Sequence, residues 1–136
     1  MTPEDIKQQL MANAKEITRL NQRIDETVRN RGKNAKALDD WKSACAEFHR
    51  RYEELAFPGG YEGAHERILA GEPNTIEVAL CFLECRPYFF RSGYMYKALL
   101  RKVKQAPLSE AQEQRLHLVL ERVTQWQAAR RSKLAA

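Results

Sequence analysis

The feature that most constrains the fold of this chain is an uninterrupted heptad of large side chains. Between positions 38 and 55 these side chains recur at alternating intervals of three and four residues: Leu38, Trp41, Cys45, Phe48, Tyr52 and Leu55. Residues with this spacing lie along one stripe of an α-helix. Such a stripe needs a facing apolar surface, so the sequence predicts a helix that packs along its length against another helix.

The preceding segment is expected to supply that second helix. Thr2 is a good N-cap and Pro3 a good first helical residue. If Asn13 takes one position of the stripe, the same alternating spacing continues through Ile6, Leu10, Ile17, Leu20 and Ile24. A short connection over residues 30–34, with the first helix ending near Gly32, predicts an antiparallel hairpin over residues 1–56. Asn13 either sets the register of this hairpin or lies at a solvated end of it.

A stretch rich in glycine and proline separates the hairpin from the rest of the chain. Residues 57–74 hold four of the six glycines, and a short helix over residues 62–70 fits within them. Asn74 and Glu77 have the form of a capping box that opens the next helix. This helix is expected to be buried nearly all round over residues 78–83 and to stop before Pro87.

Two further helices are predicted after Pro87. Ser92 can cap a helix that runs through Lys104. Ser109 with Gln112 repeats the capping logic for a last helix, from Glu110 to about residue 131. One face of that last helix is expected to pack inward through Leu116, Val119, Leu120, Val123 and Trp126.

Composition agrees with an all-α fold. The 17 alanines and 14 leucines outnumber the 15 valines, isoleucines and threonines, and no Asn-Gly or Asp-Gly hairpin dipeptide occurs. The 136 residues suit one domain, with the hairpin over 1–56, the connection over 57–74 and the C-terminal helices over 75–131. We expect three to four shorter helices packed beside the hairpin, as a helical bundle or a short HEAT-like α-solenoid.

Several classes of protein are not expected from this sequence. Its 43% apolar residues are enough for a folded core. The longest apolar run, residues 78–83, is much shorter than a membrane helix, and the first residues are acidic, unlike a secretory signal. Three cysteines do not form a paired disulfide framework. We therefore expect a cytoplasmic protein that does not enter membranes.

Residue types that carry catalysis or bind metals occur, but in weak arrangements. Cys81 and Cys85 lie one helical turn apart, without the second ligand pair that structural zinc usually needs. Glu62 and Glu66 share a helical face beside His65, which is the best enzymatic alternative, although no nucleophile motif accompanies them. The sequence therefore predicts a protein that is not an enzyme and holds no metal or cofactor.

The most distinctive segment combines aromatic and basic residues. Residues 86–104 hold five aromatic and six basic side chains, and residues 86–136 carry 11 basic and 3 acidic ones, a net charge of +8. On the predicted helix, an outward stripe is formed by Tyr94, Lys97, Arg101 and Lys104. We expect this stripe, together with Arg91 and Tyr61, to contact a macromolecular partner. The alternative is that Tyr88, Phe89 and Phe90 are core residues and the lysines only solubilise the surface.

The same segment resembles a known group of proteins. Tyr88 to Tyr94, followed by Lys97, Leu99 to Arg101 and Pro107-Leu108, is similar to a stretch of small all-helical bacterial proteins of uncertain function, some of them immunity proteins. The resemblance covers about residues 86–110 and transfers no site residues. It implies a bacterial interaction protein that binds and neutralises a toxin.

The sequence thus predicts a non-enzymatic protein-binding module. Because the chain carries a net charge of +5, the surface of its partner should be acidic. The alternative is an accessory protein that binds nucleic acid through the basic C-terminal third.

Overall fold

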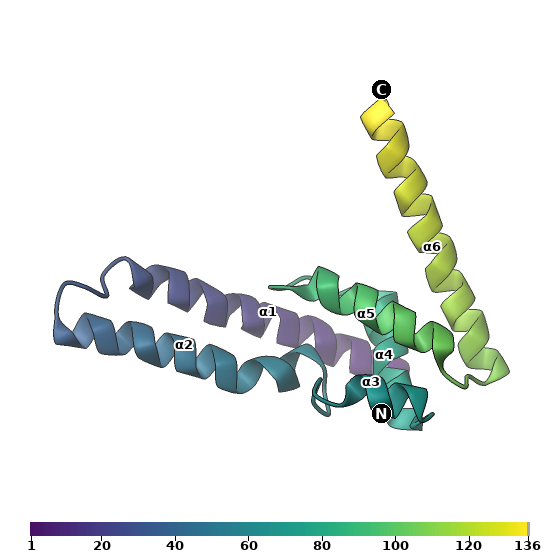
Figure 1. The fold of residues 1–136 in the computed structure, drawn as a ribbon, viewed down its shortest axis with the longest axis horizontal. Coiled ribbons are helices and arrows are strands. Elements are labelled where there is room, and N and C mark those ends of the chain that lie inside the picture. The colour runs from purple at the N-terminus through teal and green to yellow at the C-terminus, as the bar shows by residue number, and fades with distance from the viewer. Residues whose placement is uncertain (136) are drawn as a thin grey trace.

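Six helices make up the computed structural model, which describes residues 1–135. They are α1 (Pro3–Val28), α2 (Ala35–Ala56), α3 (Ala64–Leu69), α4 (Pro73–Cys85), α5 (Ser92–Gln105) and α6 (Glu110–Ala135) (Figure 1). Every regular element among these residues is helical, which confirms the predicted all-α class.

Helices α1 and α2 form the predicted antiparallel hairpin (Figure 1). The Thr2 hydroxyl accepts a hydrogen bond from the Asp5 N–H, and the Asp5 carboxylate accepts one from the Thr2 N–H, so the start of α1 is capped in both directions. Helix α1 ends at Val28, four residues before the expected Gly32. Asn13 is buried, and its amide oxygen accepts a hydrogen bond from Gln9 on the same helix, 2.7 Å away.

The apolar stripe of α2 is less buried than its spacing predicted. Phe48 is buried, whereas Trp41, Tyr52 and Leu55 are only half-buried, and the small Ala44 takes a core position. Figure 1 shows the reason for Trp41: the far end of the hairpin extends beyond the other helices, so no third element covers its flanks. Two helices alone cannot enclose side chains as large as Trp41.

The core of the molecule lies around α4. This helix packs on α1, α3, α5 and α6. Of the run 78–83 that was predicted to be buried, residues 79–83 are buried and Val78 is half-buried. Helix α3 packs on both α4 and α5. The HEAT-like alternative is wrong, because α5 and α6 do not pack along their lengths as a stacked pair; α6 packs on α4 instead.

Two of the expected helix caps are also wrong. Helix α4 begins at Pro73, one residue before Asn74, and the Thr75 hydroxyl donates to Glu72 while it accepts from Arg67. Ser92 is the first residue inside α5, and its hydroxyl accepts the Phe89 N–H at 3.1 Å. In both places, side-chain hydrogen bonds hold the preceding turn instead of capping the helix.

The capping box that was expected at the start of α6 is confirmed. The Ser109 hydroxyl accepts the Gln112 N–H, and the Gln112 amide oxygen accepts the Ser109 N–H. Leu116 and Val119 bury the first half of the helix against the body of the molecule.

The second half of α6 projects away from the bundle (Figure 1). All residues from Thr124 to Ala135 are exposed, and the helix continues past residue 131, where it was expected to fray. Trp126, which was expected to face inward, is 47% exposed. Among residues 1–135, no helix combines the length and the apolar character needed to cross a membrane.

Candidate macromolecular interface on helices α5 and α6

The loop between α4 and α5 is held in an unusual conformation. Arg86 and Arg91, one at each end of the loop, have left-handed backbones with φ of 47° and 68°. An L-residue in this region costs roughly 1–2 kcal/mol, and for this reason glycine is the usual residue there. Strain of this kind often accompanies a functional site.

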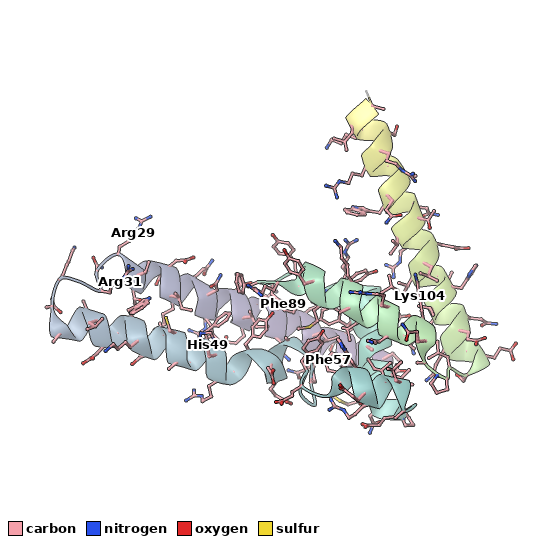
Figure 2. The ribbon with its side chains drawn as sticks, in the orientation of Figure 1. Arg29, Arg31, His49, Phe57, Phe89 and Lys104 are labelled. Carbon is pink, nitrogen blue, oxygen red and sulfur yellow. The ribbon has the colours of Figure 1, made fainter. Side chains whose placement is uncertain are left out.

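A buried ring fixes the middle of this loop. Phe89, which is labelled in Figure 2, is buried, and the centre of its ring lies 6.1 Å from that of Phe82 and 6.0 Å from that of Tyr52. The Tyr52 hydroxyl donates a hydrogen bond of 2.7 Å to the Phe90 carbonyl oxygen. Because the backbone is tied down here, the ring of Tyr88 is left 89% exposed and that of Phe90 49% exposed. Phe89 is therefore a core residue, but Tyr88 and Phe90 are not.

The outward stripe of α5 lies on the surface, as its spacing predicted. Tyr94, Lys97, Arg101 and Lys104 are all exposed, and so is Arg91 in the loop. The opposite face, with Tyr96, Leu99 and Val103, is buried. We call the exposed set the basic aromatic face, and it comprises Tyr88, Phe90, Arg91, Tyr94, Lys97, Arg101 and Lys104.

Arg86 joins three helices at one edge of this face. Its guanidinium carbon lies 5.0 Å from the centre of the Tyr96 ring on α5 and 4.8 Å from that of the Trp126 ring on α6. Arg130, one turn beyond Trp126, stacks on the same indole at 5.5 Å. Cation–π contacts of this kind contribute about 0.5–1 kcal/mol each at exposed sites. Burial raises the pKa of Tyr96, although the charges of Arg86 and Arg122 oppose that rise.

A groove of about 550 Å³ lies between α5 and α6, and we call it the α5–α6 groove. On the α5 side it is lined by Gly93, Tyr96 and Lys97, with Arg86 beside them. The α6 side is lined by Trp126, Gln127, Arg130, Arg131 and Leu134. Lys104 lies two turns beyond Lys97, on the side of α5 that faces α6 (Figure 2).

The charge around the groove is of one sign. Residues 86–105 contain six basic and no acidic side chains, and residues 122–135 contain four basic and no acidic ones. Glu77 and Glu84 of α4 lie apart from the groove, because both pair with Arg115 at 2.8 and 2.6 Å. This pairing holds the first half of α6 on α4, and among residues 1–135 no carboxylate side chain lines the groove.

Tyr61, the remaining expected contact residue, is placed differently. It is half-buried, its ring packs on Phe57, and its hydroxyl shares a 2.9 Å hydrogen bond with His65 Nε2. Burial lowers the pKa of His65, and the nearby charges of Lys102 and Arg101 lower it further. Tyr61 and His65 thus lie on the α3 side of the α5 cations, away from the groove.

The candidates for catalysis and metal binding remain dispersed. Within residues 1–135, no three His, Cys, Asp or Glu side chains gather as a metal site. Burial raises the pKa of Cys81 to about 11, so this thiol stays protonated at neutral pH and is a poor nucleophile. Glu62 and Glu66 beside His65 are both exposed.

The basic excess of residues 86–136 was recognised in the sequence, but the contact residues that α6 provides were missed. Arg86 was counted only as part of a basic segment, and Trp126 was assigned to the core. One signal was available in the sequence, since no acidic residue follows Glu121. That bias marks the end of α6 as part of the same cationic surface as α5.

Comparisons with protein-family models, curated proteins and solved structures find no match to this chain.

Proposed function

We propose that this chain is a non-enzymatic binding protein that docks on a protein with an acidic surface, through the basic aromatic face and the adjoining second half of α6. The observation that carries the proposal is the continuous cationic surface of α5 and the second half of α6, which lacks any carboxylate and displays large aromatic rings. Tyrosine, tryptophan and arginine are the residue types that most often dominate binding energy at protein interfaces.

The rigidity of the loop supports this reading. Phe89, the Tyr52 hydroxyl and the Ser92 hydroxyl together hold residues 86–92 in one conformation. Docking on a preorganised surface loses less conformational entropy than docking on a mobile one. On this proposal, the strained backbone at Arg86 and Arg91 is kept because it holds the rings of Tyr88, Phe90 and Tyr94 in fixed positions on the surface.

Neutralisation of a toxin is the specific form of this function that we propose. It is supported by the resemblance of residues 86–110 to small bacterial helical proteins, some of them immunity proteins. An immunity protein works by occupying a surface that its toxin needs, so it requires an interface and no catalytic group. The toxin should present carboxylates opposite Lys97, Arg101 and Lys104, because a basic toxin would be repelled.

A second candidate function is the binding of single-stranded nucleic acid. The specific observation that favours it is the exposure of Tyr88 and Tyr94, at 89% and 77%, among cations. Bases stack on exposed rings while lysine and arginine pair with phosphates. This candidate predicts affinity that falls steeply as the salt concentration rises.

The test is a pair of charge-reversed variants used as bait. Lys97→Glu with Arg101→Glu reverses the basic aromatic face, whereas Lys36→Glu with Lys42→Glu reverses two exposed cations on α2 and changes net charge equally. Nuclease-treated lysate of the host is passed over the wild type and both variants, and bound proteins are identified by mass spectrometry. The proteins of interest bind the wild type and the α2 variant but not the α5 variant, and each is then purified and titrated.

The outcomes separate the candidates. We expect one acidic protein to form a stoichiometric complex with the wild type, and to lose affinity by about a hundredfold or more with the α5 variant because of repulsion. A partner that binds both variants equally would overturn the proposal. Binding of an RNA or DNA oligonucleotide, with no protein partner surviving nuclease treatment, would favour the second candidate.

A further inference from the structure

The α5–α6 groove has features that its own fold does not require. Gly93 lies within the first turn of α5, at a helical backbone conformation that any residue adopts, and a Cβ built there meets nothing within 4 Å. Glycine weakens a helix relative to alanine. Neither backbone conformation nor internal packing therefore explains the absence of a side chain at this point of the groove wall, whereas close approach of a ligand would explain it.

Within residues 1–135, the opposite wall is largely uncovered, apart from Arg86 stacked on the Trp126 ring. Trp126, Arg130 and Leu134 follow one another at intervals of four residues and so form a single ridge of α6. Leu134 is 79% exposed and Trp126 is 47% exposed. A helical segment with this exposure gains most of its stability only when one face packs on something.

The chemistry of the two walls defines the occupant. Lys97, Arg130, Arg131 and Arg86 offer four cations and call for carboxylates or phosphates. Leu134 and the exposed part of Trp126 would pack on apolar side chains of a ligand. These two apolar residues alternate with Arg130 along the ridge of α6. A nucleic acid offers phosphates and flat base faces, whereas an acidic amphipathic helix offers carboxylates and aliphatic side chains at the same helical spacing as the Trp126–Arg130–Leu134 ridge, which is the better match to an exposed leucine.

We propose that the α5–α6 groove seats one acidic amphipathic α-helix of the partner protein, which packs between α5 and α6 as a third helix. This proposal rests on the proposed function, because it names the part of the acidic partner that is bound. The backbone of the incoming helix passes closest at Gly93, its carboxylates pair with Lys97 and Arg130, and its apolar side chains cover Trp126 and Leu134.

The experiment titrates the full chain with synthetic probes. Trp41→Phe leaves Trp126 as the only tryptophan, so its fluorescence reports on the groove directly. The probes are a peptide of about 20 residues with glutamate and leucine in helical register, the same peptide with glutamine in place of glutamate, poly-L-glutamate, and a single-stranded oligonucleotide of mixed sequence.

Two leucine substitutions locate the binding. Gly93→Leu fills the groove, and Gly32→Leu adds the same side chain in the hairpin turn, where a Cβ also meets nothing within 4 Å. Circular dichroism melts are recorded for both, and we expect Gly93→Leu to melt no lower than the wild type because leucine is the better helix former.

We expect the glutamate–leucine peptide to bind saturably, about tenfold or more tightly than the other three probes, and to lose about tenfold or more with Gly93→Leu but not with Gly32→Leu. No saturable change in Trp126 fluorescence, or equal binding by the glutamine peptide, would overturn the proposal. Tighter binding by the oligonucleotide would assign the groove to nucleic acid instead.

Failure of this proposal and failure of the proposed function give different results. If Gly93→Leu still captures the acidic partner while the Lys97 and Arg101 reversal does not, the face binds the partner but the groove does not. If the reversal also captures the partner, both proposals fail.

Discussion

Residue 86 offers a sharp test of the strained loop, because two substitutions there separate backbone strain from side-chain contact. Arg86→Ala removes both cation–π contacts and keeps a Cβ in the left-handed region. Arg86→Gly removes the same contacts but relieves the strain. The two variants therefore differ only in the Cβ and in the greater freedom of glycine in the unfolded chain.

The magnitudes follow from the geometry. Loss of the two stacking contacts, at about 0.5–1 kcal/mol each, makes Arg86→Ala less stable than the wild type by about 1–2 kcal/mol. In Arg86→Gly, relief of the left-handed strain raises the free energy of unfolding by roughly 1–2 kcal/mol relative to Arg86→Ala. The greater freedom of glycine in the unfolded chain lowers it by about 0.4–1 kcal/mol. We expect Arg86→Gly to be more stable than Arg86→Ala by about 0.5–1 kcal/mol, and less stable than the wild type by about 0–1.5 kcal/mol.

The assay is urea unfolding monitored by circular dichroism, with wild type and both variants measured side by side. Equal slopes of free energy against urea concentration are required for the comparison. If Arg86→Ala proves as stable as Arg86→Gly, or more stable, residue 86 is not held in a left-handed conformation and the account of the loop is wrong.

Three further predictions concern the fold. Phe48→Ala should lower the free energy of unfolding by about 3–5 kcal/mol in a urea titration, since it removes a buried ring that stacks on Tyr52; a loss below 1 kcal/mol would show that the hairpin seam is loose. Gly93→Ala should raise the melting temperature, because alanine favours a helix and its Cβ meets nothing here, and a lower melting temperature would reveal a hidden contact. Hydrogen bonds from Arg19 lower the pKa of Glu16 to about 2 from an ordinary 4.5, so its contribution to stability is complete above about pH 4.5 and is lost as the pH falls toward 2. Glu16→Gln should flatten that loss of urea midpoint on acidification, and an unchanged slope would contradict the assignment.

The helices were predictable because their signals are local. Spacings of three and four residues marked the stripes of α1, α2 and α5, and the pairs at Thr2 and Ser109 marked two helix starts. The start of α4 was misplaced because Asn74 competes with Pro73, which can open a helix by itself, and because Glu72 takes the hydroxyl of Thr75. A capping pattern read from sequence does not reveal which side chain makes the bond.

Burial was harder to predict, because it depends on which helices meet. Trp41 and Trp126 both continue an apolar stripe, but each lies on a part of its helix that extends beyond the neighbouring helices and so is not covered by them. The direction of α6 is set by contacts far apart in the sequence, above all by Arg115 with Glu77 and Glu84. No local pattern encodes such a pairing.

The same distinction holds for the candidate site: some of its residues follow from local patterns, and others depend on how the helices meet. The outward stripe of α5 followed from helical spacing and the known direction of its apolar face. Arg86 could not be placed, because its position between two rings depends on a left-handed backbone that is usual for glycine and on the path of α6. A residue that departs from local preferences, as Arg86 does at a left-handed position usual for glycine, often marks a functional surface.

Amide hydrogen exchange, measured with and without the partner, can locate the binding surface that we propose on α5 and the second half of α6. In the free chain we expect rapid exchange over residues 124–135, whose helix is exposed on every side. With the purified acidic partner bound, we expect strong protection over these residues and over the loop and first turns of α5, residues 86–97. Protection confined to the α1–α2 hairpin, with residues 124–135 exchanging as before, would contradict it.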